Sequence, residues 1–280
     1  YFEKFTRMSS QSGEAAHGYY NAKVQSFFDI WGGENIHFGI FRTGNETLAE
    51  ASMNTIKEMY SMVQTSIEPG GSALELGSGF GGAARYLSNR GHQVTCVDAS
   101  AENNAVNARL NEERGVSAIT IVEGRFEALD LPDASFDLAW SQEAICHSTS
   151  VTDVFRETFR VLRPGGIFAL GNTCCTDSVP EATLAELNRR NTLDLRTIEF
   201  QSQLAETMGF EVATCHDMSG HLSPHYKKMI EEVREKETLL VERYGDKQFK
   251  RIVESLEYWL KICYEGNLAW GIWQFSKPHQ

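Results

Sequence analysis

Residues 73–82 read Ala73-Leu74-Glu75-Leu76-Gly77-Ser78-Gly79-Phe80-Gly81-Gly82. An apolar run ends in an acidic residue and a glycine cluster, and helix-like apolar spacing follows in residues 83–87. This order predicts a strand, a tight turn and the start of a helix. Glycine allows positive φ and lets a ligand approach the main chain, and a helix start offers unpaired N–H groups. We therefore expect a polar ligand at this turn.

The spacing of the glycines narrows the kind of ligand. Gly77, Gly79 and Gly82 match the G-x-G-x-x-G pattern of dinucleotide sites. A second apolar strand ends in Asp98, about 20 residues on, where a carboxylate binds a ribose diol. A nucleoside ligand is thus supported, whereas a pyrophosphate is not required. A packing turn without any ligand is the alternative.

Composition limits the class of protein. The chain has 280 residues, 41% of them hydrophobic, which suffices for one large domain or a core with a cap. Its net charge of −12 and the absence of a Lys/Arg block disfavour nucleic-acid and membrane-surface partners. No apolar run approaches the ~20 residues of a membrane span. Because the chain begins at Tyr1, a preceding targeting segment stays an open alternative.

The cysteines point to a reducing compartment. All six lack C-x-x-C or Cys/His ligand spacing, so we expect no structural zinc and no other metal. Buried free thiols are typical of cytoplasmic proteins. We therefore expect a cytoplasmic protein.

Alternating strand and helix patterns between residues 72 and 172 predict a parallel sheet. Strands are expected at 72–76, 93–97, 118–123, 136–141 and 166–171, and helices at 81–90, 102–114 and 150–162. Further along come a helical insertion at 173–198, a helix at 199–208, a strand at 209–215, two charged helices within 223–266 and a last strand at 271–275. We divide the chain into an N-terminal arm with lid helices (1–66) and a core (67–280) with cap insertions at about 173–198 and 220–266.

Four stretches carry a resemblance to a known family. Glu75, two places before Gly77, resembles the first motif of class I S-adenosylmethionine (SAM) methyltransferases; nicotinamide enzymes seldom carry an acid there. The other three are Trp31-Gly32-Gly33-Glu34-Asn35-Ile36-His37-Phe38-Gly39, Phe136-Asp137-Leu138-Ala139-Trp140-Ser141-Gln142-Glu143-Ala144-Ile145-Cys146-His147-Ser148 and Gly266-Asn267-Leu268-Ala269-Trp270-Gly271. They resemble the sarcosine/dimethylglycine N-methyltransferases and, more distantly, tocopherol and phosphoethanolamine methyltransferases. The resemblance covers nearly the whole chain from Tyr19.

This resemblance implies a Rossmann-like α/β fold: a seven-stranded, mostly parallel sheet with an antiparallel last strand and a helical cap or lid. It also implies SAM as cofactor, with S-adenosylhomocysteine as product. The cofactor residues it implies are Glu75, Gly77, Ser78, Gly79, Asp98, Ala99, Arg125, Phe126 and Ser141. Arg125 stands at the adenine position, where it cannot accept a hydrogen bond from the adenine amino group. That contact must therefore use the backbone or another side chain.

The resemblance also implies catalytic residues beside the sulfonium methyl. Gln142 and Glu143 end the fourth strand there, and a histidine matching His147 pairs with an N-terminal tyrosine in relatives. We choose Tyr20 as that partner and keep Tyr19 in reserve. Methyl transfer needs alignment and a neutral amine. His147 suits the role of base because free imidazole titrates near ~6.5; selective binding of the deprotonated amine is the alternative.

Substrate contacts are sought among aromatic and charged residues. Aromatic faces stabilise a quaternary ammonium by about 0.5–2 kcal/mol each. The candidates are Tyr20, Trp31, Phe38, Tyr226 and Trp270, of which we expect about two to line the site while the others pack the cap. For a substrate carboxylate, Arg196 or Arg42 is expected, and Lys227 and Lys228 are weaker candidates. His37 serves loop packing or substrate contact, and Glu143 is either a buried counter-charge or structural.

The leading hypothesis is SAM-dependent N-methylation of sarcosine or dimethylglycine to give glycine betaine, an osmoprotectant. The first alternative is a methyltransferase of another small acceptor, such as a phosphobase, a phenol or a tocopherol- or sterol-like molecule. A nicotinamide oxidoreductase and a non-catalytic nucleoside-binding scaffold are the others. We expect a small-molecule amine as partner and a monomer or weak homodimer. The number of methyl groups added and the use of glycine itself stay open.

Overall fold

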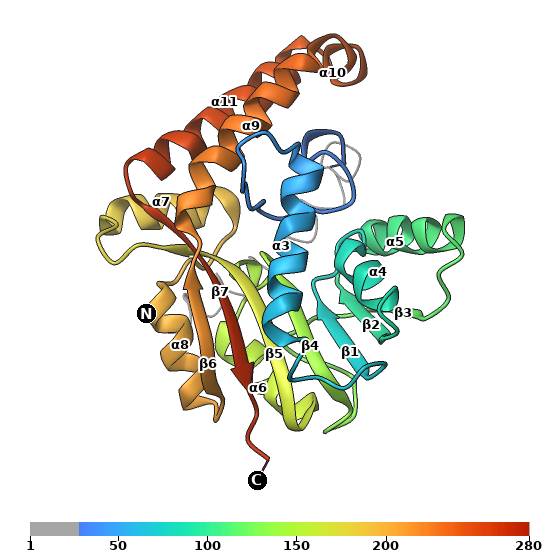
Figure 1. Ribbon diagram of the computed structural model, residues 1–280. Coiled ribbons are helices and arrows are strands. Elements are labelled where there is room, and N and C mark those ends of the chain that lie inside the picture. Colours follow the sequence, from blue (N-terminus) through green and yellow to red (C-terminus); the bar gives the residue numbers. More distant parts are fainter. Residues whose placement is uncertain (1–27, 280) are drawn as a thin grey trace.

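The computed structural model describes residues 28–279, and its centre is one seven-stranded sheet of order β3-β2-β1-β4-β5-β7-β6 (Figure 1). The strands are β1 Ser72–Leu76, β2 Gln93–Asp98, β3 Ile119–Glu123, β4 Phe136–Gln142, β5 Leu162–Cys175, β6 Glu211–Asp217 and β7 Leu268–Ser276. Strands β1 to β5 are mutually parallel, and β7 is antiparallel to both β5 and β6. The predicted fold class is thereby confirmed. Tyr19 and Tyr20 lie outside the described residues.

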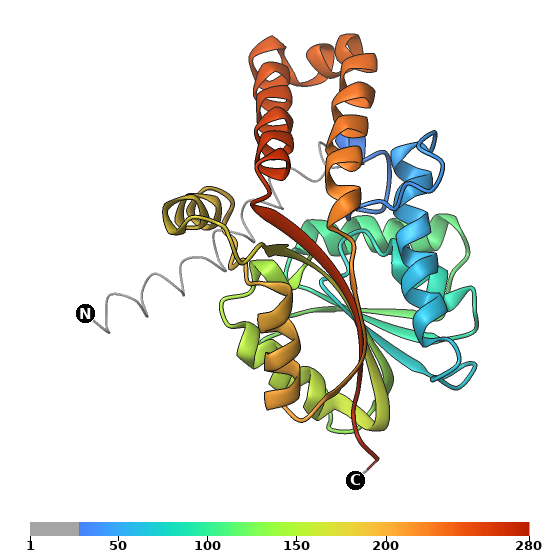
Figure 2. The ribbon, with the colours of Figure 1, turned by 60° about the vertical axis from the view of Figure 1, so that its left-hand side comes forward.

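Helices cover both faces of the sheet (Figure 2). One apolar cluster joins α3 (Leu48–Val63) and α4 (Gly82–Ser88) to the sheet, and the other joins α6 (Val151–Val161) and α8 (Ile198–Thr207) to the opposite face. Neighbouring strand residues divide between these clusters: Ala73 belongs to the first and Leu74 to the second. Alternation along a strand explains this division, and double coverage explains why the strands read as continuous apolar runs.

Helix α3 belongs to the layer on the sheet, although the sequence division groups it with the lid. Its buried residues Leu48, Ile56 and Met59 join the same cluster as the strands. Thr47 begins the helix with a capping box, in which its hydroxyl accepts from the Glu50 backbone N–H and the Glu50 carboxylate accepts from the Thr47 N–H. The loop before α3, residues 31–41, is therefore held close to the sheet.

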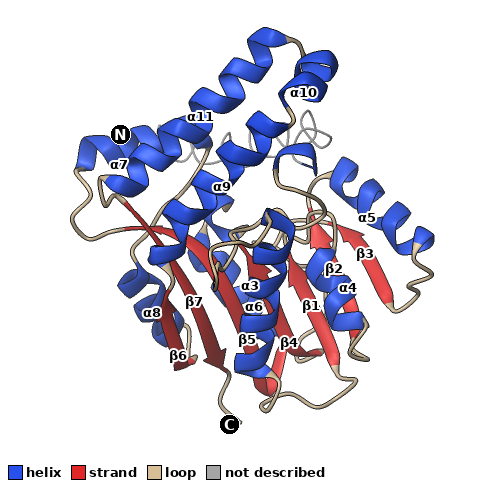
Figure 3. Ribbon diagram, turned by 45° about the horizontal axis from the view of Figure 1, so that its top comes forward, coloured by secondary structure: helices blue, strands red, loops and turns tan. Residues whose placement is uncertain are grey.

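The cap differs from its prediction. It contains three helices rather than two: α9 (Leu222–Glu235), α10 (Glu237–Tyr244) and α11 (Asp246–Tyr264), which stand at one end of the sheet (Figure 3). Gly245, with φ +84°, ends α10 at the predicted joint. The other break lies at Lys236, where neither glycine nor proline marks it in the sequence. Tyr226 of α9 stacks on Trp259 of α11 with ring centroids 6.1 Å apart.

Strand β5 is longer than the predicted 166–171 because β7 pairs with it from Ile167↔Ser276 to Cys175↔Leu268. A partner so distant in the chain cannot be read from local pattern. The predicted helical insertion after β5 contains α7 (Glu181–Asn191). Elsewhere in the fold, α5 (Ala101–Glu113) lies beside β2 and β3. Within residues 28–279, no helix is both long and apolar enough to cross a membrane.

Candidate active site

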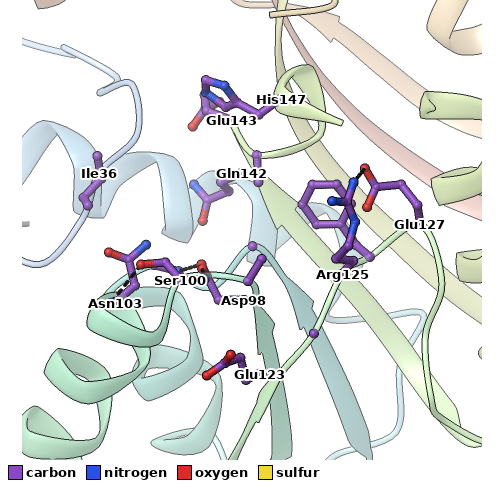
Figure 4. Close-up of a pocket in the computed structure, with 16 residues that line it drawn as sticks. Ile36, Asp98, Ser100, Asn103, Glu123, Arg125, Glu127, Gln142, Glu143 and His147 are labelled. Carbon is purple, nitrogen blue, oxygen red and sulfur yellow. Dashed lines mark hydrogen bonds and ion pairs between the residues drawn. The ribbon is translucent and has the colours of Figure 1, made fainter. Parts of the chain in front are cut away.

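A cavity of about 370 Å³ opens where β1, β2, β3 and β4 end (Figure 4). This volume lies within the ~300–1,000 Å³ usual for small-molecule sites. The sheet order reverses between β1 and β4, and ligands of open α/β sheets bind at such a switch point. The cavity is lined by Ile36, Gly77, Gly79, Asp98, Ala99, Ser100, Asn103, Glu123, Gly124, Arg125, Phe126, Glu127, Gln142, Glu143, Ala144 and His147.

The glycine turn forms one wall of the cavity. Gly77 and Gly79 have φ of +70° and +51°, and the Gly77 N–H donates to the Val97 carbonyl at 2.8 Å. A Cβ on Gly77 would lie 2.3 Å from the Ala144 Cβ, whereas a Cβ on Gly79 would meet no atom within 4 Å. Gly77 is thus required by packing, and Gly79 leaves open space beside the cavity.

Asp98 is fixed by the turn and by the next helix. One carboxylate oxygen accepts the Gly79 N–H at 2.8 Å and the other accepts the Ser100 N–H at 2.8 Å. The Ser100 hydroxyl in turn caps α5 by accepting the Asn103 N–H at 3.1 Å. A carboxylate held at the end of the second strand in this way is suited to bind a ribose diol. Sequence reasoning missed Ser100 and Asn103, although Ser100 is a recognisable N-cap residue.

The loop after β3 forms the next wall. Glu127 accepts from the Thr149 N–H at 2.8 Å and pairs with the Arg125 guanidinium at 3.3 Å, so Arg125 is held against its neighbours. Phe126 is half-buried against the apolar cluster behind the loop. Glu123 also lines the cavity and was not foreseen. Its place at the end of a parallel strand was the available signal.

Gln142, Glu143 and His147 form the far end of the cavity (Figure 4). His147 Nδ1 lies 3.2 Å from the Thr192 carbonyl, which can only accept, so Nδ1 carries the proton. Burial lowers the pKa of His147 to about 4, below the free-imidazole value assumed from the sequence. Burial raises the pKa of Glu143 to about 8, opposed by the hydrogen bond from Trp270. Ser141 does not line the cavity; its hydroxyl donates to the Leu76 carbonyl at 2.9 Å and ties β4 to β1.

A smaller hollow of about 30 Å³ continues from the same glycine turn. Its wall includes Glu75, whose pKa burial raises to about 8 while Arg85 opposes the shift. His37 Nδ1 lies 3.1 Å from the Phe38 carbonyl, so its Nε2 is an acceptor. In the described part of the chain, that Nε2 and the Ser78 hydroxyl are buried without a hydrogen-bond partner. These acceptor groups suit an ammonium group, as in the methionine part of the predicted cofactor.

The predicted aromatic substrate contacts lie elsewhere. Phe38 packs 5.6 Å from Trp270, 5.9 Å from Tyr226 and 6.3 Å from Trp31, between ring centroids. As far as the structure describes the chain, none of these four lines the cavity. These four side chains cluster because they are shielded from solvent, and they join the lid loop, α9 and β7 in one apolar contact.

The predicted carboxylate-binding cations also lie away from the cavity. Arg196 is exposed and pairs with Asp194 at 2.9 Å, and Arg42 pairs with Glu58 at 2.6 Å. Lys227 is exposed, and Lys228 pairs with Glu231 at 3.3 Å. Among the described residues that line the cavity, Arg125 is the one arginine or lysine.

An ion-pair cluster holds the lid loop to the core. Glu34 of the loop pairs with the buried Arg85 of α4 at 2.8 Å and with Arg114 at 2.7 Å. Ile36 and His37 follow directly and line the cavity and the hollow. Over residues 28–279, no group of three or more His, Cys, Asp or Glu is arranged to hold a metal. All six cysteines are free thiols.

Comparison with known proteins agrees with this site. The model of a methyltransferase domain matches residues 74–170. A sarcosine/dimethylglycine N-methyltransferase of Aphanothece halophytica is 33% identical over 255 residues, covering 90% of this chain and 92% of that protein. One from Halorhodospira halochloris is 34% identical over 277 residues, covering 97% and 99%.

A solved structure extends the comparison to the fold. A protein of Galdieria sulphuraria, described as a candidate sarcosine dimethylglycine methyltransferase, superposes with a TM-score of 0.86 at 28% identity and covers 92% of this chain and 99% of its own. The likeness therefore extends over most of the chain and is not confined to the glycine turn.

Proposed function

Because the chain belongs to the sarcosine/dimethylglycine N-methyltransferase family, we propose that it methylates the nitrogen of sarcosine and dimethylglycine with SAM and so forms glycine betaine. One structural observation carries the proposal. A single cavity runs from Asp98, suited to a ribose, to Gln142, Glu143 and His147, suited to a small polar acceptor.

The residues present fit the cofactor. When bound, SAM supplies an electrophilic methyl group on a sulfonium sulfur. Asp98 would hold the ribose hydroxyls, and the open side of Gly79 lets the ligand approach the backbone. Glu75, Ser78 and His37 would hold the ammonium end. Ala99, Arg125 and Phe126 would border the base.

At the acceptor end, His147 is neutral at pH 7 because burial lowers its pKa to about 4. With Nδ1 bonded to the Thr192 carbonyl, Nε2 is the ring nitrogen whose lone pair can accept a hydrogen bond. A neutral ring neither repels a cationic amine nor competes for its proton strongly, so His147 orients the amine and is a weak base. Its pairing with Tyr20 remains a prediction.

The charges along the cavity favour an amine over a phosphobase. Asp98, Glu123 and Glu127 line it, against Arg125 alone among the described cationic residues. A phosphate would meet net negative charge there, whereas an ammonium would be attracted. The net charge of −12 disfavours nucleic-acid and membrane-surface partners, and six free cysteines support a cytoplasmic location. We further infer a monomer or weak homodimer whose betaine serves as an osmoprotectant.

The test is an acceptor screen with purified protein and SAM. Glycine, sarcosine, dimethylglycine, phosphoethanolamine and a simple phenol are supplied singly, and products are identified by mass. We expect S-adenosylhomocysteine and betaine from sarcosine and dimethylglycine. Turnover only with a different acceptor would contradict the proposal, as would a melting temperature raised by NAD(H) but not by SAM.

A further inference from the structure

Two buried tryptophans hold consecutive cavity residues. The Trp140 indole N–H donates to the side-chain oxygen of Gln142 at 2.8 Å, and the Trp270 indole N–H donates to Oε1 of Glu143 at 2.8 Å. Both tryptophans are fully buried. An indole N–H can only donate, so it determines which way round the Gln142 amide lies and which Glu143 oxygen is engaged.

The second polar atom of each side chain remains available. Gln142 Nε2 and Glu143 Oε2 are buried, and the part of the chain that the structure describes provides neither with a hydrogen-bond partner. One is a donor and the other an acceptor. A buried polar group without a hydrogen-bond partner destabilises the protein, and more so when it is charged. A ligand that satisfies both atoms would recover that cost.

The backbone brings the two side chains to one cavity. Alternation along a strand would send neighbouring side chains to opposite faces. At Glu143 the chain turns left-handed, with φ +48°, while its N–H is anchored to the Gly171 carbonyl at 2.9 Å. Both side chains consequently line the same cavity (Figure 4). A non-glycine residue at positive φ is strained, and such strain is concentrated at functional sites.

Among residues 28–279, no cationic side chain forms an ion pair with the carboxyl group of Glu143. Burial raises the pKa of this group to about 8. A side chain at position 171 would crowd it, because a Cβ on Gly171 would lie 3.3 Å from Oε1. A buried carboxyl group without a cationic partner is stabilised when a cation is supplied.

We propose that Gln142 and Glu143 together recognise the zwitterion of an α-amino acid. Gln142 Nε2 donates to the substrate carboxylate, and Oε2 of the Glu143 carboxylate accepts the N–H of the substrate's ammonium group and takes up that proton before methyl transfer, which leaves the nitrogen lone pair free to attack. Trp140 and Trp270 are the positioning residues. The inference rests on the proposed function and assigns the two residues that recognise its amino-acid substrates. It also favours release of the product, because a quaternary ammonium group has no N–H to donate to Glu143.

The first experiment changes Glu143 to Gln, which keeps the side chain's size and an oxygen for Trp270. The Glu143→Gln variant should raise the KM of dimethylglycine about 10-fold or more, as expected for losing a charge-assisted hydrogen bond. Its Kd for S-adenosylhomocysteine should change less than twofold. In complexes loaded with S-adenosylhomocysteine, wild-type protein should bind dimethylglycine more tightly than betaine, and the variant should bind them alike. An unchanged KM in a folded variant would overturn the inference.

The second experiment addresses Gln142 through the substrate. Wild-type protein should prefer dimethylglycine to dimethylaminoethanol, which lacks the carboxylate, and Gln142→Met should remove most of that preference. Trp140→Phe and Trp270→Phe delete the indole N–H groups and should raise the KM of dimethylglycine with little change in kcat. A preference that survives Gln142→Met overturns the carboxylate contact.

The proposed function can fail separately from this inference. Wild-type protein that turns over neither sarcosine nor dimethylglycine contradicts the proposed function. Calorimetry with the S-adenosylhomocysteine complex then judges the inference: amino-acid binding weakened by Glu143→Gln supports it, and absence of amino-acid binding overturns it.

Discussion

The two ends of the cavity are built in different ways. Apart from His37 of the lid loop, the cofactor end comes from one continuous stretch, residues 75–127, in which each strand or turn presents its polar group directly. The acceptor end combines residues far apart in the chain: Ile36 from the lid, Gln142 at the end of β4, His147 after it, the Thr192 carbonyl and Trp270 of β7. A short motif can therefore specify cofactor binding, whereas acceptor choice depends on packing between distant segments.

The carboxyl groups of Glu75 and Glu143 show the same difference. Burial raises the pKa of each to about 8. Glu75 has the Arg85 guanidinium near enough to oppose the shift, whereas among described residues Glu143 has only neutral donors. The cofactor end thus supplies part of its own charge compensation, and the acceptor end leaves it to the substrate.

The largest expected effect separates packing from ligand contact within the glycine turn. Gly77→Ala combines φ +70° with a Cβ 2.3 Å from the Ala144 Cβ, so the turn must move at the point where the two ends meet. We expect a lower melting temperature and S-adenosylhomocysteine binding weakened by about 100-fold or more. Thermal unfolding and calorimetry measure both.

Gly79→Ala is the matched control, because its added Cβ meets no atom within 4 Å. Its free energy of unfolding should fall only by the cost of the backbone strain, about 1–3 kcal/mol. It should nevertheless bind the ligand poorly. Equal melting temperatures for the two variants would show that the contact with Ala144 is unimportant.

An intermediate effect is expected at the acceptor end. His147→Ala should lower kcat about 100-fold, the lower range for a group that assists proton transfer, while S-adenosylhomocysteine binding stays nearly intact. Since the pKa of His147 is about 4, the wild-type kcat profile should show no step near pH 6.5. Parallel loss of turnover and cofactor binding would make His147 a structural residue instead.

The smallest effect is a change in how stability depends on pH. Glu75 and Glu143 have folded-state pKa values raised from 4.5 to about 8. Each is neutral when folded and ionised when unfolded between these values, so stability falls as pH rises through this window. Between about pH 7 and 8 the buried histidines, whose pKa values are lowered in the folded state, are mostly neutral in both states and offset little of the slope.

The unliganded protein should therefore lose stability from pH 7 to 8, and Glu75→Gln and Glu143→Gln should each reduce that loss. Glu143→Gln should reduce it at least as much, because no nearby cation offsets its burial. Melting temperatures across this range measure the slopes. Slopes unchanged in both variants would mean that neither carboxyl group is neutral in the folded protein.

Much of the architecture was predictable from local pattern. Residues 72–172 alternate apolar strands with capped helices, and their order in the sheet follows from parallel pairing of consecutive units. The break at Lys236 and the extension of β5 were missed because neither has a local signal: one lies between good helix formers and the other depends on β7. The aromatic residues of the lid were assigned to the substrate because their types alone do not distinguish a binding surface from a buried contact.

The amino-acid sequence by itself determined the sheet, the glycine turn and the carboxylate after β2, since these depend on the conformational freedom of glycine and on short-range spacing. Only the tertiary structure decided that His147 is buried and weakly basic, that Arg196 faces solvent, and that two indoles orient Gln142 and Glu143. Desolvation and hydrogen-bond direction arise from neighbours brought together by folding, and for this reason no local pattern encodes them.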